Sequence, residues 1–252
     1  MVSDKKYKFG TSVFRIVSPC LLKENASYRS FLAEDTVKED YLYEICPVQA
    51  NIESEQIPSL QVKRDGNRFK VSVRESLLPE ITVANLFSAA ETAKILLERD
   101  EFVLHASYVF YRGKALLFCA PSGTGKSTQA NFWSQARNAI TVNEDRAIVF
   151  RQNGMYYAGG CWATGKSGTC RNISAPIHRI ILLEQGAENT VVRLSLAEKV
   201  KRITAQCSFD SGDIQMRERI VCDVLDLVEA VSVIGYACVN DISAVEELEK
   251  HL

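Results

Sequence analysis

The sequence predicts an α/β protein in which a nucleotide-binding core follows a strand-rich α+β region. Three observations predict this arrangement. A glycine-rich loop lies between a strand-like and a helix-like segment near the middle of the chain, strands and helices alternate after it, and strand-like segments dominate the first hundred residues. We therefore expect a strand-rich region over 1–100 and a P-loop region over 101–252.

The overall composition excludes several classes of partner. The 252 residues are 46% hydrophobic and 24% charged, which is typical of a globular protein. A formal net charge of −1 gives no general attraction to nucleic acid or to anionic membranes. The charged start is followed by no apolar segment typical of a signal peptide, and no apolar run approaches the roughly 20 residues that span a bilayer. We expect a cytoplasmic protein without nucleic-acid or membrane partners, in which eight cysteines without a C-x-x-C pair are reduced thiols.

The first region is predicted to be rich in strands. β-Branched and aromatic residues predict four strands, with Asp65-Gly66 as a hairpin turn between the last two: 8–17, 41–48, 60–64 and 68–74. Apolar spacing over 85–99 predicts a helix. Because the region carries no residues with evident chemistry, we expect it to recognise the substrate, with an edge strand that pairs with an extended peptide.

The second region is predicted to alternate between strands and helices. Turn residues separate the strands at Arg112-Gly113 and Asn153-Gly154. The predicted strands are 103–111, 114–120, 139–142, 147–151, 155–158, 180–184 and 231–239. The predicted helices run from Lys126 to about residue 136 and over 196–207, 213–230 and 243–251.

The segment 120–128, Ala-Pro-Ser-Gly-Thr-Gly-Lys-Ser-Thr, matches the Walker A pattern A/G-x-x-x-x-G-K-S/T in the strand-to-helix context that the pattern requires. Its glycines allow a tight turn whose N–H groups point at phosphates, and the helix N-terminus adds partial positive charge. Lys126 would reach the β- and γ-phosphates, and the Ser127 hydroxyl would bind Mg²⁺. The sequence thus predicts a site for ATP and Mg²⁺ made by Ser122, Gly123, Thr124, Gly125, Lys126, Ser127 and Thr128.

Two further features flank this loop. The acidic pair Glu144-Asp145 follows the strand 139–142, so one helix and one strand would return it to the loop. One carboxylate could bind Mg²⁺ together with Ser127 while the other accepts a proton from an attacking hydroxyl; the alternative is an exposed acidic turn. His105 lies on the strand before the loop, where a lone histidine is either a core residue or an active-site residue.

These three elements in this order resemble the catalytic domain of HPr kinase/phosphorylase, which shares its nucleotide core with ATP-dependent phosphoenolpyruvate carboxykinase. The matching stretch is 104–150, and weaker similarity continues through Gly159-Gly160-Cys161-Trp162 and 180–196 to the C-terminus. The chain looks most like the small branch found with peptide-modification gene clusters, such as the lasso-peptide tail kinases. The resemblance implies a P-loop core of the HPr kinase/PEP carboxykinase type and, because HPr kinases assemble as oligomers, a homo-oligomer.

The resemblance also implies roles for individual residues. Lys126 becomes the phosphate-binding lysine, Ser127 the Mg²⁺ ligand, Asp145 the base that activates the acceptor hydroxyl, and His105 an active-site support. Glu144 replaces the first Asp of the HPr kinase pair and is a further candidate metal ligand. Lys166 and Arg171, in a Gly/Ser/Thr-rich loop, either stabilise the transferred phosphate or are solvated loop cations.

This sequence also departs from the family's pattern. The later E-x-R-G segment and the P-G-R-N segment tied to phosphorylase activity have no match, so we expect a kinase without the reverse activity. The leading expectation is transfer of the γ-phosphate of ATP to a Ser or Thr hydroxyl of a peptide or small protein. The alternatives are a small-metabolite kinase, for example one acting on free serine, and a nucleotide-gated peptide-binding protein without transferase activity.

Overall fold

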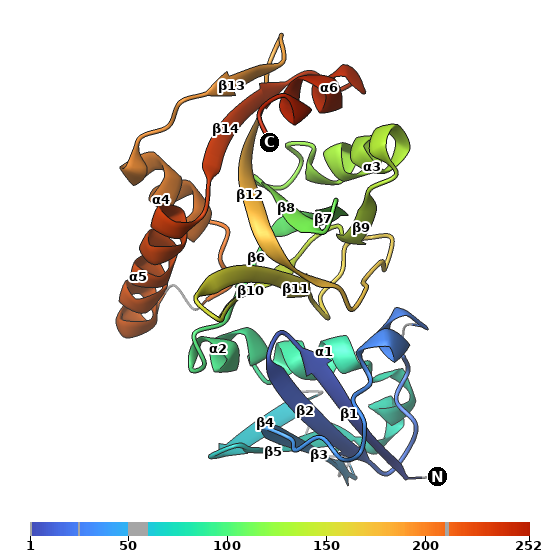
Figure 1. Cartoon of the computed structure of the whole chain (residues 1–252). Helices are drawn as coiled ribbons and strands as arrows, with labels where there is room; N and C mark the ends of the chain where they lie inside the picture. Colours follow the sequence, from blue (N-terminus) through green and yellow to red (C-terminus); the bar gives the residue numbers. More distant parts are fainter. Residues whose placement is uncertain (1, 25, 50–59, 210–211) are drawn as a thin grey trace. The chain divides into compact units, whose positions relative to one another are not determined.

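The protein is of mixed α/β type and forms two compact units. The computed structural model describes residues 2–24, 26–49, 60–209 and 212–252 (Figure 1). The first unit comprises Met1–Ala93 and the second Lys94–Leu252. The boundary therefore lies earlier in the chain than residue 100, at which the sequence analysis had placed it. No helix in the described part of the chain has the length and apolar character needed to cross a membrane.

The first unit is built on a five-stranded sheet with the order β1-β2-β3-β5-β4. Its strands are β1 (Ser3–Phe9), β2 (Ser12–Ser18), β3 (Tyr41–Val48), β4 (Leu60–Asp65) and β5 (Arg68–Arg74). Short helices connect or follow them: η1 (Ala26–Phe31), η2 (Glu75–Glu80), α1 (Val83–Ala89) and α2 (Thr92–Leu97), the last of which crosses the unit boundary. β1 and β4 are the edge strands.

Stacked aromatic rings form the core of this unit. Tyr43 and Phe69 stack with ring centroids 4.6 Å apart. Phe87 of α1 lies 5.7 Å from Phe9, 5.0 Å from Phe14 and 5.5 Å from Tyr43 between ring centroids. Ring contacts of Phe87 therefore join the buried aliphatic side chains Val83 and Leu86 in fixing the apolar face of α1.

Two predictions for this unit are wrong in the same way. The predicted strand 8–17 is a hairpin, because Gly10 adopts φ +61° and Phe9 pairs with Ser12. The predicted helix 85–99 is two short helices, because Glu91 adopts φ +49° between them. In both segments an apolar pattern continued across a residue whose backbone turns the chain. The strand at 41–48 and the hairpin of β4 and β5 around Gly66 are confirmed.

The second unit contains a nine-stranded sheet flanked by helices. The strand path is β6-β10-β11-β12-β8-β7-β9, with β14 paired to β12 and β13. The strands are β6 (Phe102–Leu104), β7 (Ala106–Tyr111), β8 (Lys114–Cys119), β9 (Ile140–Asn143), β10 (Ala147–Gln152), β11 (Met155–Gly160), β12 (Ser174–Gln185), β13 (Thr190–Val192) and β14 (Val233–Cys238). The helices are α3 (Lys126–Arg137), α4 (Leu196–Thr204), α5 (Ile214–Ala230) and α6 (Ser243–Glu249).

Alternating side chains of the central strands build two cores, one on each face of the sheet. Ile180 and Leu182 of β12 pack in the core that includes α4 and α5, whereas Ile181 and Leu183 pack in the core that includes α3 and α6. This period of two is expected for a strand buried on both faces. Figure 1 shows the two helix pairs on opposite sides of β12. The central strand β8 and the loop after it are consequently held from both faces.

The predicted elements of this unit are confirmed with four differences. The predicted strand 103–111 is broken at His105 into β6 and β7, which pair with β10 and β8 respectively. The strand predicted at 180–184 begins earlier, at Ser174, and β13 was not predicted. The predicted helix 196–207 ends at Thr204, after which Cys207 pairs with Leu104.

Candidate active site

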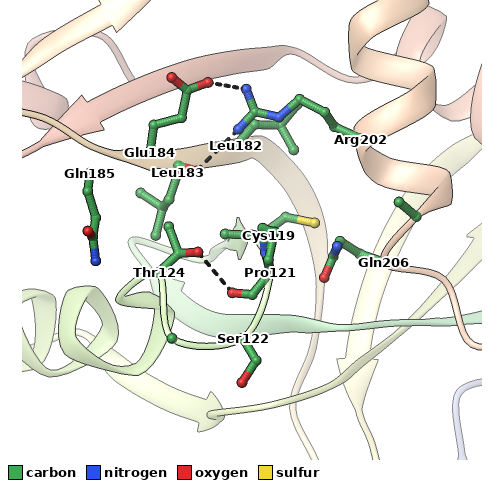
Figure 2. A pocket seen from close by; sticks show the side chains of 13 residues that line it. Cys119, Pro121, Ser122, Thr124, Leu182, Leu183, Glu184, Gln185, Arg202 and Gln206 are labelled. Atoms are coloured by element: carbon green, nitrogen blue, oxygen red, sulfur yellow. Dashed lines mark hydrogen bonds and ion pairs between the residues drawn. The ribbon is translucent and has the colours of Figure 1, made fainter.

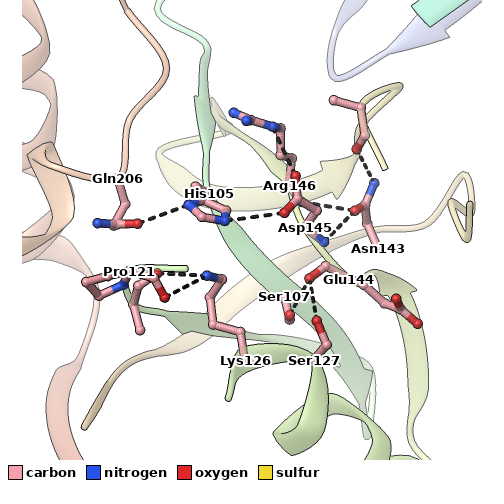
Figure 3. Close-up of polar contacts among 12 residues, drawn as sticks. His105, Ser107, Pro121, Lys126, Ser127, Asn143, Glu144, Asp145, Arg146 and Gln206 are labelled. Carbon is pink, nitrogen blue, oxygen red and sulfur yellow. Dashed lines mark hydrogen bonds and ion pairs between the residues drawn. The ribbon is translucent and has the colours of Figure 1, made fainter. Parts of the chain in front are cut away.

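The strand register brings three separate segments to one edge of the sheet. β7 pairs antiparallel with β8, so that Ala106 lies opposite Cys119. β7 also pairs antiparallel with β9, so that Tyr108 lies opposite Asn143. His105, the loop after β8 and the acidic pair after β9 are therefore neighbours, although they are separated in the sequence (Figure 3).

The loop 120–125 connects β8 to α3 and depends on two glycines. Gly123 has φ +83° and Gly125, the N-cap residue of α3, has φ +114°. A Cβ at either position would contact nothing within 4 Å, so the positive φ rather than lack of space favours glycine. No side chain caps the start of α3, which leaves its first N–H groups and the positive end of the helix dipole for an anion.

Lys126 lies folded over this loop. Its Nζ donates to the carbonyl oxygens of Ala120, at 2.8 Å, and of Pro121, at 3.2 Å. The residue is only 6% exposed, and burial lowers the pKa of its ammonium group, while the Cys119 thiol and the Asp145 carboxylate act in the opposite direction. The loop carbonyls thus stabilise a buried ammonium group at the place where a phosphate would bind.

The main chain of the acidic turn is tied to two serines. The Glu144 carbonyl oxygen accepts hydrogen bonds from the hydroxyls of Ser107 and, at 3.5 Å, of Ser127. The two carboxylates differ in direction: in Figure 3 the Asp145 carboxylate lies on the His105 side, whereas the Glu144 carboxylate points away from Lys126. The carboxylate of Glu144 lies beside Gly165: its Oε2 is 3.7 Å from the position that a Cβ would occupy at this glycine.

Asp145 is held by two basic side chains. Its Oδ1 lies 3.3 Å from His105 Nε2, and its Oδ2 lies 3.2 Å from Arg146 Nε. The hydrogen bond from His105 lowers the pKa of the Asp145 carboxyl group, with burial opposing it and the charges of Arg146 and Lys126 adding to it. Asp145 is therefore an ionised carboxylate that is held in one orientation, and its charge interacts with that of Lys126.

Asn143 is a site residue that the sequence analysis missed. Its side chain is fully buried, and its Oδ1 accepts from the backbone N–H groups of Asp145, at 2.9 Å, and Arg146, at 3.0 Å. Its Nδ2 donates to the carbonyl oxygens of Cys161, at 3.0 Å, and Ala163, at 2.9 Å. One amide thus fixes the acidic turn to the segment after β11. The sequence signal was a polar residue in an apolar strand immediately before the acidic pair.

Gln206 is a second residue that the sequence analysis missed. It follows α4, and its Oε1 lies 3.1 Å from His105 Nδ1. Its backbone carbonyl also accepts from the His105 N–H at 2.8 Å. His105 is therefore held between Gln206 on one ring nitrogen and Asp145 on the other.

The loop cations Lys166 and Arg171 have different surroundings. Lys166 is exposed. Arg171, also exposed, lies beside β9: its backbone N–H bonds to the Val142 carbonyl at 2.9 Å and its Nε bonds to the Thr141 carbonyl at 3.2 Å.

Two pockets lie on either side of the loop. The α4-side pocket, of about 730 Å³, is lined by residues 119–124, 182–185, Arg202, Ala205 and Gln206 (Figure 2). The α3-side pocket, of about 360 Å³, is lined by Gly123, Thr124, Gly125, Thr128, Gln129, Gln185, Gly186, Cys238, Val239 and Asn240. Both lie at the carboxyl ends of the parallel strands β8, β12 and β14, where α/β proteins commonly bind ligands.

The donor atoms at this edge suit a nucleotide with Mg²⁺. Magnesium prefers oxygen ligands and usually keeps waters and substrate phosphates with one or two protein ligands. Ser127 supplies a hydroxyl and Asp145 a carboxylate beside the loop. In the described residues no three His, Cys, Asp or Glu side chains cluster as a metal cage would require. The arrangement fits a metal that is held largely by the nucleotide.

Comparisons with known proteins add little to this geometry. None of the family models and none of the curated proteins matches the sequence. Among solved structures, the chain is similar to the Hpr(Ser) kinase/phosphatase from Coxiella burnetii, with 12% sequence identity and a TM-score of 0.33 over 59% of this chain and 95% of that chain.

Replacing Asn143 should destabilise the second unit. In Asn143→Leu, two carbonyls and two backbone N–H groups lose their partner at a fully buried side chain, so we expect the free energy of unfolding to fall by about 3 kcal/mol or more. Urea denaturation measures the loss. Asn131→Leu is the matched control: this asparagine is exposed on α3, and its replacement should change stability by less than about 0.5 kcal/mol. Equal effects of the two changes would contradict the role given to Asn143.

The lowered pKa of Asp145 predicts a pH dependence of stability. Because the folded pKa lies below the usual 3.8, the ionised carboxylate stabilises the folded state above that value, and the contribution is lost as the pH falls through the folded pKa. We expect the stability difference between the wild type and Asp145→Asn to be constant from pH 7 to about pH 5 and to shrink below pH 3.8. Urea titrations at each pH measure it; a difference that already shrinks at pH 6 would show that the carboxylate is not held as described.

Proposed function

We propose that this chain is an ATP-dependent kinase that transfers the γ-phosphate to a Ser or Thr hydroxyl of a peptide or small protein. One observation carries the proposal: the sheet register sets the His105–Asp145 pair beside the loop that Lys126 covers. A phosphate-binding loop alone indicates only a nucleotide. An oriented carboxylate next to it adds the means to accept a proton from an alcohol.

The two pockets suggest how the nucleotide would lie. Lys126 and Ser127 mark the end of the loop for the β- and γ-phosphates and Mg²⁺. Gln206, which touches His105, lines the α4-side pocket, so this pocket borders the proposed reaction centre and suits the acceptor. The α3-side pocket is lined by Thr128 and Gln129 and not by Gln206. It therefore lies away from the His105 contact and suits the nucleoside.

In the proposed reaction each residue has one task. Lys126 leaves the loop carbonyls to bind phosphate oxygens and stabilise their charge, together with the N–H groups at the start of α3. Asp145 accepts the hydroxyl proton as the alcohol oxygen bonds to phosphorus and the bond to the β-γ bridging oxygen breaks, which releases ADP. His105 holds the carboxylate in position. Mg²⁺, bound through Ser127 and held largely by the nucleotide phosphates, would neutralise phosphate charge.

Two finer proposals rest on the sequence resemblance. We propose that the core is of the HPr kinase/PEP carboxykinase type, in the small peptide-modifying branch that resembles the lasso-peptide tail kinases. We also propose that the first unit recognises the acceptor, and its edge strands β1 and β4 are the places where an extended peptide would pair.

Asp145→Asn tests the kinase proposal. The change keeps the shape of the side chain but removes the base, so transfer should fall by about 10²–10⁴-fold. Binding of Mg·ATP, which depends on the loop, should remain. Transfer is measured as the mass gain of one phosphoryl group on Ser- or Thr-containing peptides, and binding by calorimetry.

Glu144→Gln is the matched control, because this neighbouring carboxylate points away from Lys126 and its loss should spare most of the transfer. A protein that binds Mg·ATP but transfers no phosphate to any peptide would instead be a nucleotide-gated binding protein. In that case Asp145→Asn would change neither phosphate transfer nor Mg·ATP binding.

A further inference from the structure

Gln206 contacts His105 through both its backbone and its side chain. The segment after α4 runs antiparallel to β6: the Ser208 N–H donates to the Val103 carbonyl, and the His105 N–H donates to the Gln206 carbonyl, each at 2.8 Å. The side-chain contact between Gln206 Oε1 and His105 Nδ1 is therefore set by paired backbones. An exposed surface glutamine would have no such support.

Each nitrogen of the imidazole has one side-chain partner. A carboxylate only accepts, so a hydrogen bond between His105 and Asp145 requires the proton on Nε2. A glutamine amide accepts through its oxygen and donates through its nitrogen, and it can thus serve Nδ1 whether or not that atom carries a proton. Together the contacts to Gln206 and Asp145 hold both ring nitrogens and so fix the orientation of the ring.

The amide nitrogen of Gln206 remains available to a ligand. Within the described part of the chain this nitrogen makes no hydrogen bond, and the residue lines the α4-side pocket opposite the loop (Figure 2). The guanidinium in this pocket, that of Arg202, is already bonded to the carboxylate of Glu184 and to the Leu183 carbonyl at 3.2 Å. The lining therefore offers a ligand the neutral N–H donor of Gln206, while the cation of the lining, Arg202, is already paired.

We propose that Gln206 is a positioning residue that fixes the His105 ring against Asp145 and donates its free amide N–H to an uncharged oxygen of the acceptor in the α4-side pocket. The contact to the acceptor rests on the proposed kinase function, whereas the positioning of His105 by Gln206 does not. An acceptor with a carbonyl next to the hydroxyl, as in a peptide, offers such an oxygen. Free serine offers a carboxylate instead.

The ring of His105 can be observed directly. In protein labelled with ¹⁵N-histidine, the three histidines give three sets of ring-nitrogen signals. The set that is lost in His105→Asn belongs to His105. At one fixed pH, Gln206→Met, which keeps the length but removes the amide, should shift the signal of Nδ1, because this nitrogen loses its partner. Gln206→Glu restores an acceptor and should return the Nδ1 signal toward that of the wild type.

Gln185→Met is the matched control. Gln185 lines the same pocket but is exposed at the end of β12, and its replacement should leave the His105 signals unchanged. His105 signals that are the same in Gln206→Met and wild type, or that move equally in Gln185→Met, would overturn the positioning role. These signals are measured without nucleotide, so they test the positioning role by itself. Failure of the wild type to bind Mg·ATP would instead contradict the proposed function.

The acceptor contact needs a second measurement. With the glutamine side-chain amides labelled, acetyl-Xaa-Ser-Xaa-amide peptides should shift the Gln206 signal, whereas free serine should not. In the transfer reaction Gln206→Met should lower kcat by about tenfold or more with the KM for ATP unchanged, and Gln206→Glu should recover part of it. A shift with free serine alone, or with neither probe, would overturn the acceptor contact.

Discussion

The antiparallel pairing of β7 with both β8 and β9 is the constraint on which the candidate site depends. This pairing sets the start of β7 beside the ends of its two neighbours, so that His105, the loop 120–125 and Asp145 meet without any of them being close in sequence. The two cores on either face of the sheet hold β8 in place. A shift of the register by one residue would reverse the side-chain faces and separate these groups.

The site is built from buried and half-buried polar groups that each have a hydrogen-bonding or charged partner. Lys126 is bonded to loop carbonyls, Asn143 satisfies four backbone groups, and Asp145 lies between His105 and Arg146. Each of these groups would destabilise the fold if its partner were absent. A phosphate that replaces the loop carbonyls as the partner of Lys126 would therefore bind at a place where the protein already stabilises an ammonium group.

The sequence was sufficient where the signal is local. The loop, the start of α3 and the hairpins follow from glycine and turn residues, and an acidic pair one helix beyond the loop was enough to predict that Asp145 returns to it. The break at His105 was missed, because residues 102–111 are mostly apolar and the break is made by a segment about a hundred residues away. Gln206 was missed for the same reason, since its partner His105 lies far away in the sequence. Asn143 was missed because the partners of its amide nitrogen, Cys161 and Ala163, lie beyond the next two strands.

The central claim is that the loop holds a triphosphate through Lys126 next to Asp145. A crystal structure of the protein with Mg²⁺ and a non-hydrolysable ATP analogue tests it most directly. We expect the Lys126 Nζ to leave the carbonyls of Ala120 and Pro121 and to contact the β- and γ-phosphates, with the Asp145 carboxylate on the γ-phosphate side. An analogue bound elsewhere, or bound with Lys126 still on the loop carbonyls, would contradict the account.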